Sequence, residues 1–216
     1  DVAGLESATQ TITLTHGAAT QLTLHTAAAG AQAGLPFATQ PVVYIEDADH
    51  NLVNTGDESG LTIHASSSDG TLSGTTDVRA IGGKATYSGL ILSNQIGTYS
   101  LSFRAIDAGY TGLSIGQSIN LAAGTAVALG MVNQPSTGGP TGSNFANQPS
   151  VEVIDAFGNR VLTDTGREIS VSYPAGANGG TLSGSPNVTT VDGLASFSGL
   201  SFVGKPGTNY KLHFAV

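Results

Sequence analysis

The chain is 216 residues long, carries a net charge of −8 and has charged side chains at only 10% of its positions. Its seven Lys and Arg residues are scattered, which argues against nucleic acid or an anionic membrane as a partner, because both need clustered positive charge. The sequence has no cysteine for disulfides, and no stretch approaches the ~20 apolar residues of a membrane-spanning helix. With 39% hydrophobic residues, the chain has enough apolar side chains for a packed core.

The most informative feature of the sequence is an internal repeat, which relates Gln10 to Gln117 near its start and Tyr99 to Tyr210 near its end. The matching segments are 10–15 with 117–122, 40–51 with 148–159, 71–74 with 181–184, 85–90 with 195–200, and 99–103 with 210–214. The spacing between equivalent positions drifts slightly along the chain and stays close to the length of one small β-sandwich. The repeat therefore predicts two similar units.

Short strands are predicted along both copies, because apolar and polar residues alternate with a period of two. Val43 and Ile45, for example, fall on one face of their strand. In the first copy, strands are expected near 20–26, 41–46, 61–66, 71–73, 84–92, 98–105 and 115–121, with 78–81 as a candidate paired edge. One apolar and one polar face per strand indicates antiparallel sheets that pack face to face. The predicted fold class is all-β, with two tandem sandwiches of about seven strands each.

Several motifs occur in the same order in both copies. In the first copy they are Asp47-Ala-x-x-Asn51, Thr71-Leu-Ser-Gly74, Gly83-x-Ala-Thr-Tyr-Ser88 and Gly97-Thr-Tyr-x-Leu-x-Phe103. Together they resemble the bacterial immunoglobulin-like (invasin- and intimin-type) tandem repeat domains of surface adhesins and of surface-layer or fibre proteins. The resemblance implies immunoglobulin-like sandwiches that lie outside the cell, at the bacterial cell surface, with a structural role and no enzymatic one.

The function that the resemblance implies is that of a building block of an adhesin stalk, fibre or surface layer. The expected partners are identical subunits or neighbouring repeats of the same chain, whereas a host receptor or glycan leaves no trace in the sequence. The alternative is a non-catalytic spacer or carbohydrate-binding module of a secreted multidomain hydrolase. An exposed aromatic platform would support that alternative, and the candidates for it are Tyr44, Tyr110 and Phe157. The sequence contains no catalytic motif, and no cofactor other than calcium is a candidate.

The two copies of the repeat differ at their ends. The first copy is followed by the segment 117–122, whereas the other segment of this type, 10–15, lies at the start of the chain. Ile12 and Leu14 match Ile119 and Leu121, which are expected to fill the first core as part of its last strand. The predicted parts are therefore an orphan closing strand at 1–16, a first domain at 17–122 and a second at 123–216, with the link between the domains near 106–116.

The second domain is predicted to lack its own closing strand. Its exposed acceptor edge would consist of Tyr210, Leu212 and Phe214. One interpretation is donation of the orphan strand to a neighbouring subunit, a head-to-tail contact that propagates as a fibre. The other is that the chain is a slice of a longer array, cut just before a closing strand. Folding of the orphan strand onto its own second domain is disfavoured, because residues 1–9 are too few to span two sandwiches.

The loop at 47–51 is the candidate metal site. Asp47, Asp49 and Asn51 offer three oxygens at alternate positions, and Ca²⁺ takes six to eight oxygen ligands. The alternative is a turn in which the first Asp accepts backbone N–H bonds. The turn explains both copies, whereas calcium explains one, because the second copy has Phe157 in place of Asp49.

Two further residue types have structural interpretations. Tyr99 and Tyr210 begin equivalent strands and predict tyrosine corners, in which the hydroxyl is bonded to nearby backbone. The histidines, at positions 16, 25, 50, 64 and 213, lack the spacing of a metal site and are expected to contact solvent.

Overall fold

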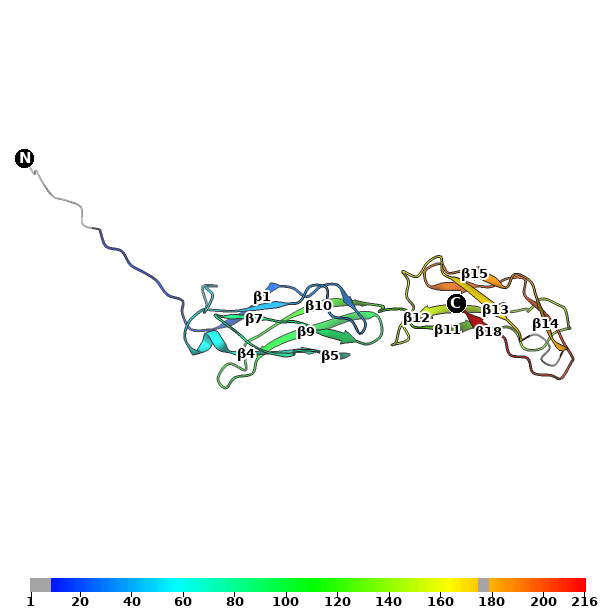
Figure 1. The fold of residues 1–216 in the computed structure, drawn as a ribbon. Helices are drawn as coiled ribbons and strands as arrows, with labels where there is room; N and C mark the ends of the chain where they lie inside the picture. The colour runs from blue at the N-terminus through cyan, green and yellow to red at the C-terminus, as the bar shows by residue number, and fades with distance from the viewer. Residues whose placement is uncertain (1–8, 175–178) are drawn as a thin grey trace, which may run out of the picture.

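The computed structural model describes residues 9–174 and 179–216, which form two β-rich lobes arranged end to end (Figure 1). The N-terminal lobe contains strands β1–β10 and the C-terminal lobe strands β11–β18, and each strand pairs only within its own lobe. The described residues include the short 3₁₀ turn η1 (Asp57–Gly60) and no α-helix, and they contain no helix that is long and apolar enough to cross a membrane.

The N-terminal lobe is a β-sandwich. One sheet has the order β1 (Gln21–Thr26), β3 (Val42–Glu46) and β7 (Lys84–Thr86). The other has the order β2 (Ala31–Gln32), β10 (Ser114–Ala122), β9 (Gly97–Ala105), β4 (Thr62–Ser67) and β6 (Asp77–Arg79). A two-stranded ribbon is formed by β5 (Thr71–Ser73) and β8 (Ile91–Ser93).

The core of this lobe contains the strand residues that the period-two alternation places inward, together with buried loop residues such as Phe37 and Val53. Val43, Ile45 and Ile63 are completely buried, and the rings of Tyr87 and Phe103 pack at 5.3 Å. The Tyr87 hydroxyl donates a 2.8 Å hydrogen bond to the carbonyl oxygen of Ile63, so the polar end of this core side chain is satisfied. The predicted all-β fold with buried sheet faces is confirmed.

The C-terminal lobe repeats this plan without two of the strands. One sheet has the order β11 (Ala128–Asn133), β12 (Ser150–Ile154) and β16 (Leu194–Ser196). The other has the order β15 (Asn187–Thr189), β13 (Glu168–Ser172) and β18 (His213–Ala215), and β14 (Thr181–Ser183) pairs with β17 (Ser201–Val203). Among the described residues, neither β2 nor β10 has a counterpart in this lobe.

Two sequence predictions about the path of the chain are wrong. The strand expected at 84–92 is divided into β7 and β8, which pair with β3 and β5 respectively. Gly89 lies between them with φ of 66°, so the backbone turns from one sheet toward the other at a residue without Cβ.

The second correction concerns the link between the lobes. The segment 106–116, predicted as that link, is the connection from β9 to β10 together with the start of β10. Its Asp and Gly turn signals belong to a reversal in which the Tyr110 N–H donates to the Asp107 carbonyl at 3.1 Å. The lobes are joined instead by the segment 123–127, between β10 and β11. Independent folding of the predicted units 17–122 and 123–216 stays a prediction.

Candidate assembly site

The N-terminal segment, residues 10–15, has no strand partner among the described residues and extends away from the N-terminal lobe (Figure 1). Its two aliphatic side chains, Ile12 and Leu14, are 72% and 87% exposed. The remainder of the predicted orphan strand, residues 1–8, lies outside the described residues.

The repeat counterpart of this segment is buried. In β10, Ile119 and Leu121 are only 5% and 3% exposed, because β10 lies between β9 and β2. Ile119 is paired with Tyr99 in an antiparallel register. The Gln117 side chain also holds the backbone of Ala28, donating to its carbonyl at 2.9 Å and accepting from its N–H at 2.8 Å. The same two aliphatic residue types are thus core in one copy and solvent-exposed in the other.

The C-terminal lobe has a groove where β10 lies in the N-terminal lobe. The groove has a volume of about 700 Å³ and is bordered by residues 135–146 and 204–212. These segments correspond in the repeat to those that flank β10, next to β2 and along β9. The apolar side chains that line the groove are Phe145, Phe202, Tyr210 and Leu212. Of the predicted acceptor edge, Tyr210 and Leu212 therefore line the groove, whereas Phe214 packs its ring on Phe197 at 5.5 Å.

The missing neighbour explains why β18 is short. In the N-terminal lobe, β9 pairs with β4 only from Leu101 to Ala105, and the strand partner of residues 97–100 is β10, with one further bond from the Ser68 N–H to the Ser100 carbonyl at 3.0 Å. The counterparts of those four residues, 208–211, form no strand, and β18 contains only His213–Ala215. An extended strand needs a partner for its backbone N–H and C=O groups, so this edge is open.

Both predicted tyrosine corners are present. The Tyr99 hydroxyl donates to the Gln95 carbonyl at 2.7 Å. The Tyr210 hydroxyl accepts from the Lys205 N–H at 2.6 Å and bonds to the Lys205 carbonyl at 3.3 Å. Each hydroxyl is bonded to the turn that precedes its segment, so the segment at Tyr210 is anchored to that turn even though residues 208–211 form no strand.

Two equivalent loops, which we call joint loops, lie one at the entrance of each lobe: residues 47–51 and residues 155–159. In the first, one oxygen of Asp47 accepts from the N–H groups of Asp49 and Asn51 at 3.0 and 2.9 Å, and the other accepts from the Gly17 N–H at 2.7 Å. In the second, the Asp155 oxygens accept from Phe157, Asn159 and Gly124 at 2.8, 2.9 and 2.8 Å. Each joint loop therefore holds the segment that enters its lobe.

These hydrogen bonds stabilise the charged form of both aspartates. Donation from the Gly17 N–H, followed by that from Asn51, lowers the pKa of Asp47 to about 2. Burial alone would raise the pKa of Asp155, but donation from Asn159, Gly124 and Phe157 outweighs it, and the pKa lies below its ordinary value.

Calcium binding by Asp47, Asp49 and Asn51 stays a prediction, and the hydrogen bonds favour the turn. The Asn51 amide donates to both Asp47 oxygens, at 3.2 and 3.1 Å, so the carboxylate is surrounded by N–H donors. In residues 9–174 and 179–216, no group of three or more His, Asp and Glu side chains is placed to hold a metal ion.

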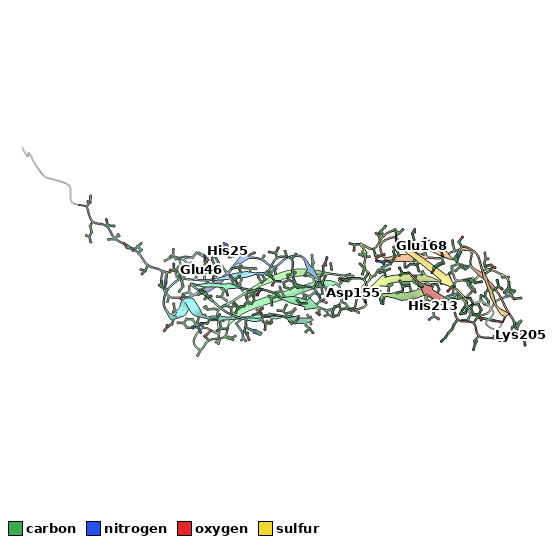
Figure 2. The ribbon with its side chains drawn as sticks, viewed as in Figure 1. His25, Glu46, Asp155, Glu168, Lys205 and His213 are labelled. Atoms are coloured by element: carbon green, nitrogen blue, oxygen red, sulfur yellow. The ribbon has the colours of Figure 1, made fainter. Side chains whose placement is uncertain are left out.

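The second joint loop connects the lobes directly, which the sequence reasoning missed. The Asn159 side chain accepts from the Ile96 N–H at 2.8 Å and donates to the Asn94 carbonyl at 3.0 Å. A Cβ placed on Gly34 would lie 2.7 Å from the Phe157 ring, so this glycine permits close contact of the lobes. Asp155, which holds the linker residue Gly124, is labelled at the junction in Figure 2. The only signal in the sequence was that Asp and Asn occupy the same loop positions in both copies.

The aromatic candidates for a carbohydrate platform lie apart and have other contacts. Tyr44 stacks on His25 at 4.1 Å, Tyr110 donates to Glu58 at 2.7 Å, and Phe157 lies at the junction. The histidines contact solvent as predicted, three of them exposed and two, His16 and His64, partly exposed.

Acid should release the entering segment at Gly17 from the first joint loop only at low pH. The folded-state pKa of Asp47 lies below the ordinary value of 3.8, so its contribution is present above about pH 4 and is lost as pH falls through about 2. In NMR spectra, the Gly17 amide shift should titrate with a midpoint near 2, and Asp47→Asn should abolish that step. A midpoint near 3.8 in the wild-type chain would contradict the hydrogen-bonded geometry.

Comparison with known proteins gives matches among solved structures alone. No protein-family model matches the chain, and no curated protein sequence matches it. The D0–D1 domains of intimin match with 13% identity and a TM-score of 0.32, covering 86% of this chain and 85% of that one. A 282-residue C-terminal fragment of intimin, in complex with the intimin-binding domain of the translocated intimin receptor, matches with 11% identity and a TM-score of 0.33, covering 92% and 64%.

Domains 1–6 of the surface-layer protein SbsC match with 11% identity and a TM-score of 0.32, covering 91% of this chain and 25% of that one. The matches thus include intimin and a surface-layer protein, two of the classes that the sequence motifs resemble. Likenesses of this size say nothing about activity or partners, so the function has to be argued from the geometry of this chain.

Proposed function

We propose that the chain is a structural building block of a bacterial cell-surface adhesin stalk, fibre or surface layer, and that its copies join head to tail by strand donation. The N-terminal segment of one copy would fill the groove of the C-terminal lobe of the next. The observation that carries this proposal is the complementarity of an unpaired Ile12/Leu14 segment and a groove at the position where Ile119 and Leu121 are buried.

The direction of the donated strand is consistent with a linear array. β10 is antiparallel to β9, so a donated segment antiparallel to β18 would run from the lobe junction toward the far tip of the C-terminal lobe. Gly17 of the donor would then lie beyond that tip, as Gly124 lies beyond the end of β10. The donor's N-terminal lobe would continue the line of the acceptor. Such a contact is heterologous and does not close on itself, so it generates a fibre.

The energy of this contact comes from two sources. Burial of Ile12 and Leu14 would contribute about 1.5–3 kcal/mol each, and the backbone ladder would satisfy the unpaired edge at residues 208–212. Loss of translational and rotational freedom opposes association. The location at the bacterial surface is supported by the motif resemblance alone.

Electron microscopy and sedimentation of the intact chain test the proposal. The wild-type chain should form fibres, and the double variant Ile12→Asp with Leu14→Asp should remain monomeric. The matched control is Thr11→Asp with Thr13→Asp, which adds the same charge on the opposite face of the segment. The counterparts of these threonines in β10, Ser118 and Asn120, are exposed, so the control should still assemble. Two-lobed monomers from the wild-type chain would overturn strand donation.

A further inference from the structure

The junction inside the chain shows how two lobes contact end to end. The second joint loop provides Asn159, whose side chain bonds to the turn at residues 94–96 of the preceding lobe at 2.8 and 3.0 Å. Asn159 is only 4% exposed as a result. This contact is separate from the sheet pairing of β10 and requires only a joint loop on one lobe and a β8–β9 turn on the other.

The first joint loop has the same geometry, and no second lobe of the described residues contacts it. His50 and Gly158 both have left-handed backbone, with φ of 63° and 78°. In both loops the fifth residue donates its N–H to the first aspartate at 2.9 Å. Asn51, however, is exposed, and its side-chain oxygen accepts no hydrogen bond from the described residues. This end of the N-terminal lobe therefore has the shape of the internal joint, and within residues 9–174 and 179–216 no second lobe packs on it.

The C-terminal lobe carries the complementary turn at its far tip, where Figure 2 labels Lys205. Tyr99 bonds to Gln95 as Tyr210 bonds to Lys205, so the turn at 204–208 corresponds to that at 94–96. Pro206 stands where the internal turn has Ile96, so the N–H that Ile96 donates to Asn159 has no direct counterpart in the outer turn. The Thr208 N–H donates to the Lys205 carbonyl at 3.3 Å, with Pro206 and Gly207 (φ 79°) as central residues. This is the pattern of a type II turn. It leaves the Gly207 N–H without an acceptor among the described residues and able to donate to Asn51.

The charges distinguish this outer contact from the internal junction. Asp49 stands in the first joint loop where the second has Phe157, and Lys205 stands in the outer turn where the internal turn has Gln95. At the internal junction Phe157 itself lies against Gly34. Asp49 and Lys205 are both exposed. A carboxylate at one end of the molecule and an ammonium at the other are complementary between copies, and complementary charges favour correct pairing.

We infer that the joint loop at residues 47–51 of one copy docks on the turn at residues 204–208 of a second copy, with Asp49 beside Lys205 and Asn51 bonded to the turn backbone. The inference rests on the proposed head-to-tail assembly and adds to it a second contact, which sets the angle between copies. Strand donation would bring the two surfaces together. In the donor, Gly17 lies two residues after Thr15, just as Gly124 lies two residues after Ala122 at the internal junction, so the first joint loop would stand the same distance beyond the donated strand.

Disulfide trapping tests this contact without interference, because the chain has no cysteine. Asp49→Cys combined with Lys205→Cys should give a ladder of disulfide-linked oligomers on a non-reducing gel, since a disulfide needs Cα atoms within about 7 Å. The matched control is Asp69→Cys combined with Lys205→Cys, which should give no ladder. Asp49→Lys should raise the concentration needed for assembly about fivefold, and Asp49→Lys with Lys205→Asp should restore it.

The possible results separate the two proposals. If the wild-type chain assembles but the variant Asp49→Cys with Lys205→Cys gives no ladder of disulfide-linked oligomers, strand donation stands and the docking contact is overturned. If the wild-type chain does not assemble, strand donation is overturned. The docking contact is then tested in a fusion of two full chains, with Lys205→Cys in the first and Asp49→Cys in the second. An intramolecular disulfide there supports the contact, and its absence overturns it.

Discussion

Truncation of both aliphatic side chains in β10 is expected to unfold the N-terminal lobe or bring it close to unfolding. Ile119 and Leu121 are almost completely buried, and replacing such side chains by alanine typically costs about 2–5 kcal/mol each. Together these losses approach the whole stability of a small domain, which is about 5–15 kcal/mol. Hydrogen exchange of the β9 amides should therefore become much faster in Ile119→Ala with Leu121→Ala.

The chain contains its own control for this experiment. Ile12→Ala with Leu14→Ala removes the same atoms from the repeat counterparts, which are 72% and 87% exposed. In the monomer, this second double variant should change lobe stability by no more than about 0.5 kcal/mol. Equal effects of the two double variants on β9 exchange would show that the N-terminal segment is already packed in the monomer, contrary to the structure.

Addition of residues 1–17 after Val216 is expected to complete the C-terminal lobe. The connection is long enough, because the path from Phe214 through Val216 to the added Ile12 is almost as long as the natural path from Phe103 to Ile119. Burial of the added Ile and Leu should contribute about 3–6 kcal/mol. Since about 1 kcal/mol shifts the unfolding temperature of a domain of this size by about 4–8 °C, the C-terminal lobe should melt at least about 10 °C higher.

Two measurements check this prediction. Calorimetry gives the unfolding temperature, and hydrogen exchange should show new protection at residues 208–211, which pair with no strand in the part of the unmodified chain that the structure describes. The control carries Ile12→Asp and Leu14→Asp in the added copy alone and should melt like the parent. The completed lobe should also accept no strand from a second copy. An unchanged melting temperature with the unmodified addition would mean that the groove is not shaped for this strand.

Most strands were predictable because their signal is local. Val43 and Ile45 face inward because successive residues of a strand point to opposite sides, a property that depends on no distant contact. The tyrosine corners were predictable for the same reason, since each hydroxyl reaches only four or five residues back. The division of the 84–92 strand was not, because residues on both sides of Gly89 alternate regularly and only their partners, β3 and β5, differ.

The sequence by itself determined the all-β fold, the repeat and the pairing of Ile12 and Leu14 with Ile119 and Leu121, since these depend on composition and on the comparison of one copy with the other. Only the tertiary structure decided where the lobes meet, that the aspartates of both joint loops hold the incoming segments, and that Phe214 of the predicted acceptor edge packs on Phe197 while Tyr210 and Leu212 line the groove. These features depend on contacts such as that between Asn159 and Ile96, which are 63 residues apart in the chain. No periodicity or local spacing encodes such a contact, because it exists only when two separately folded surfaces come together.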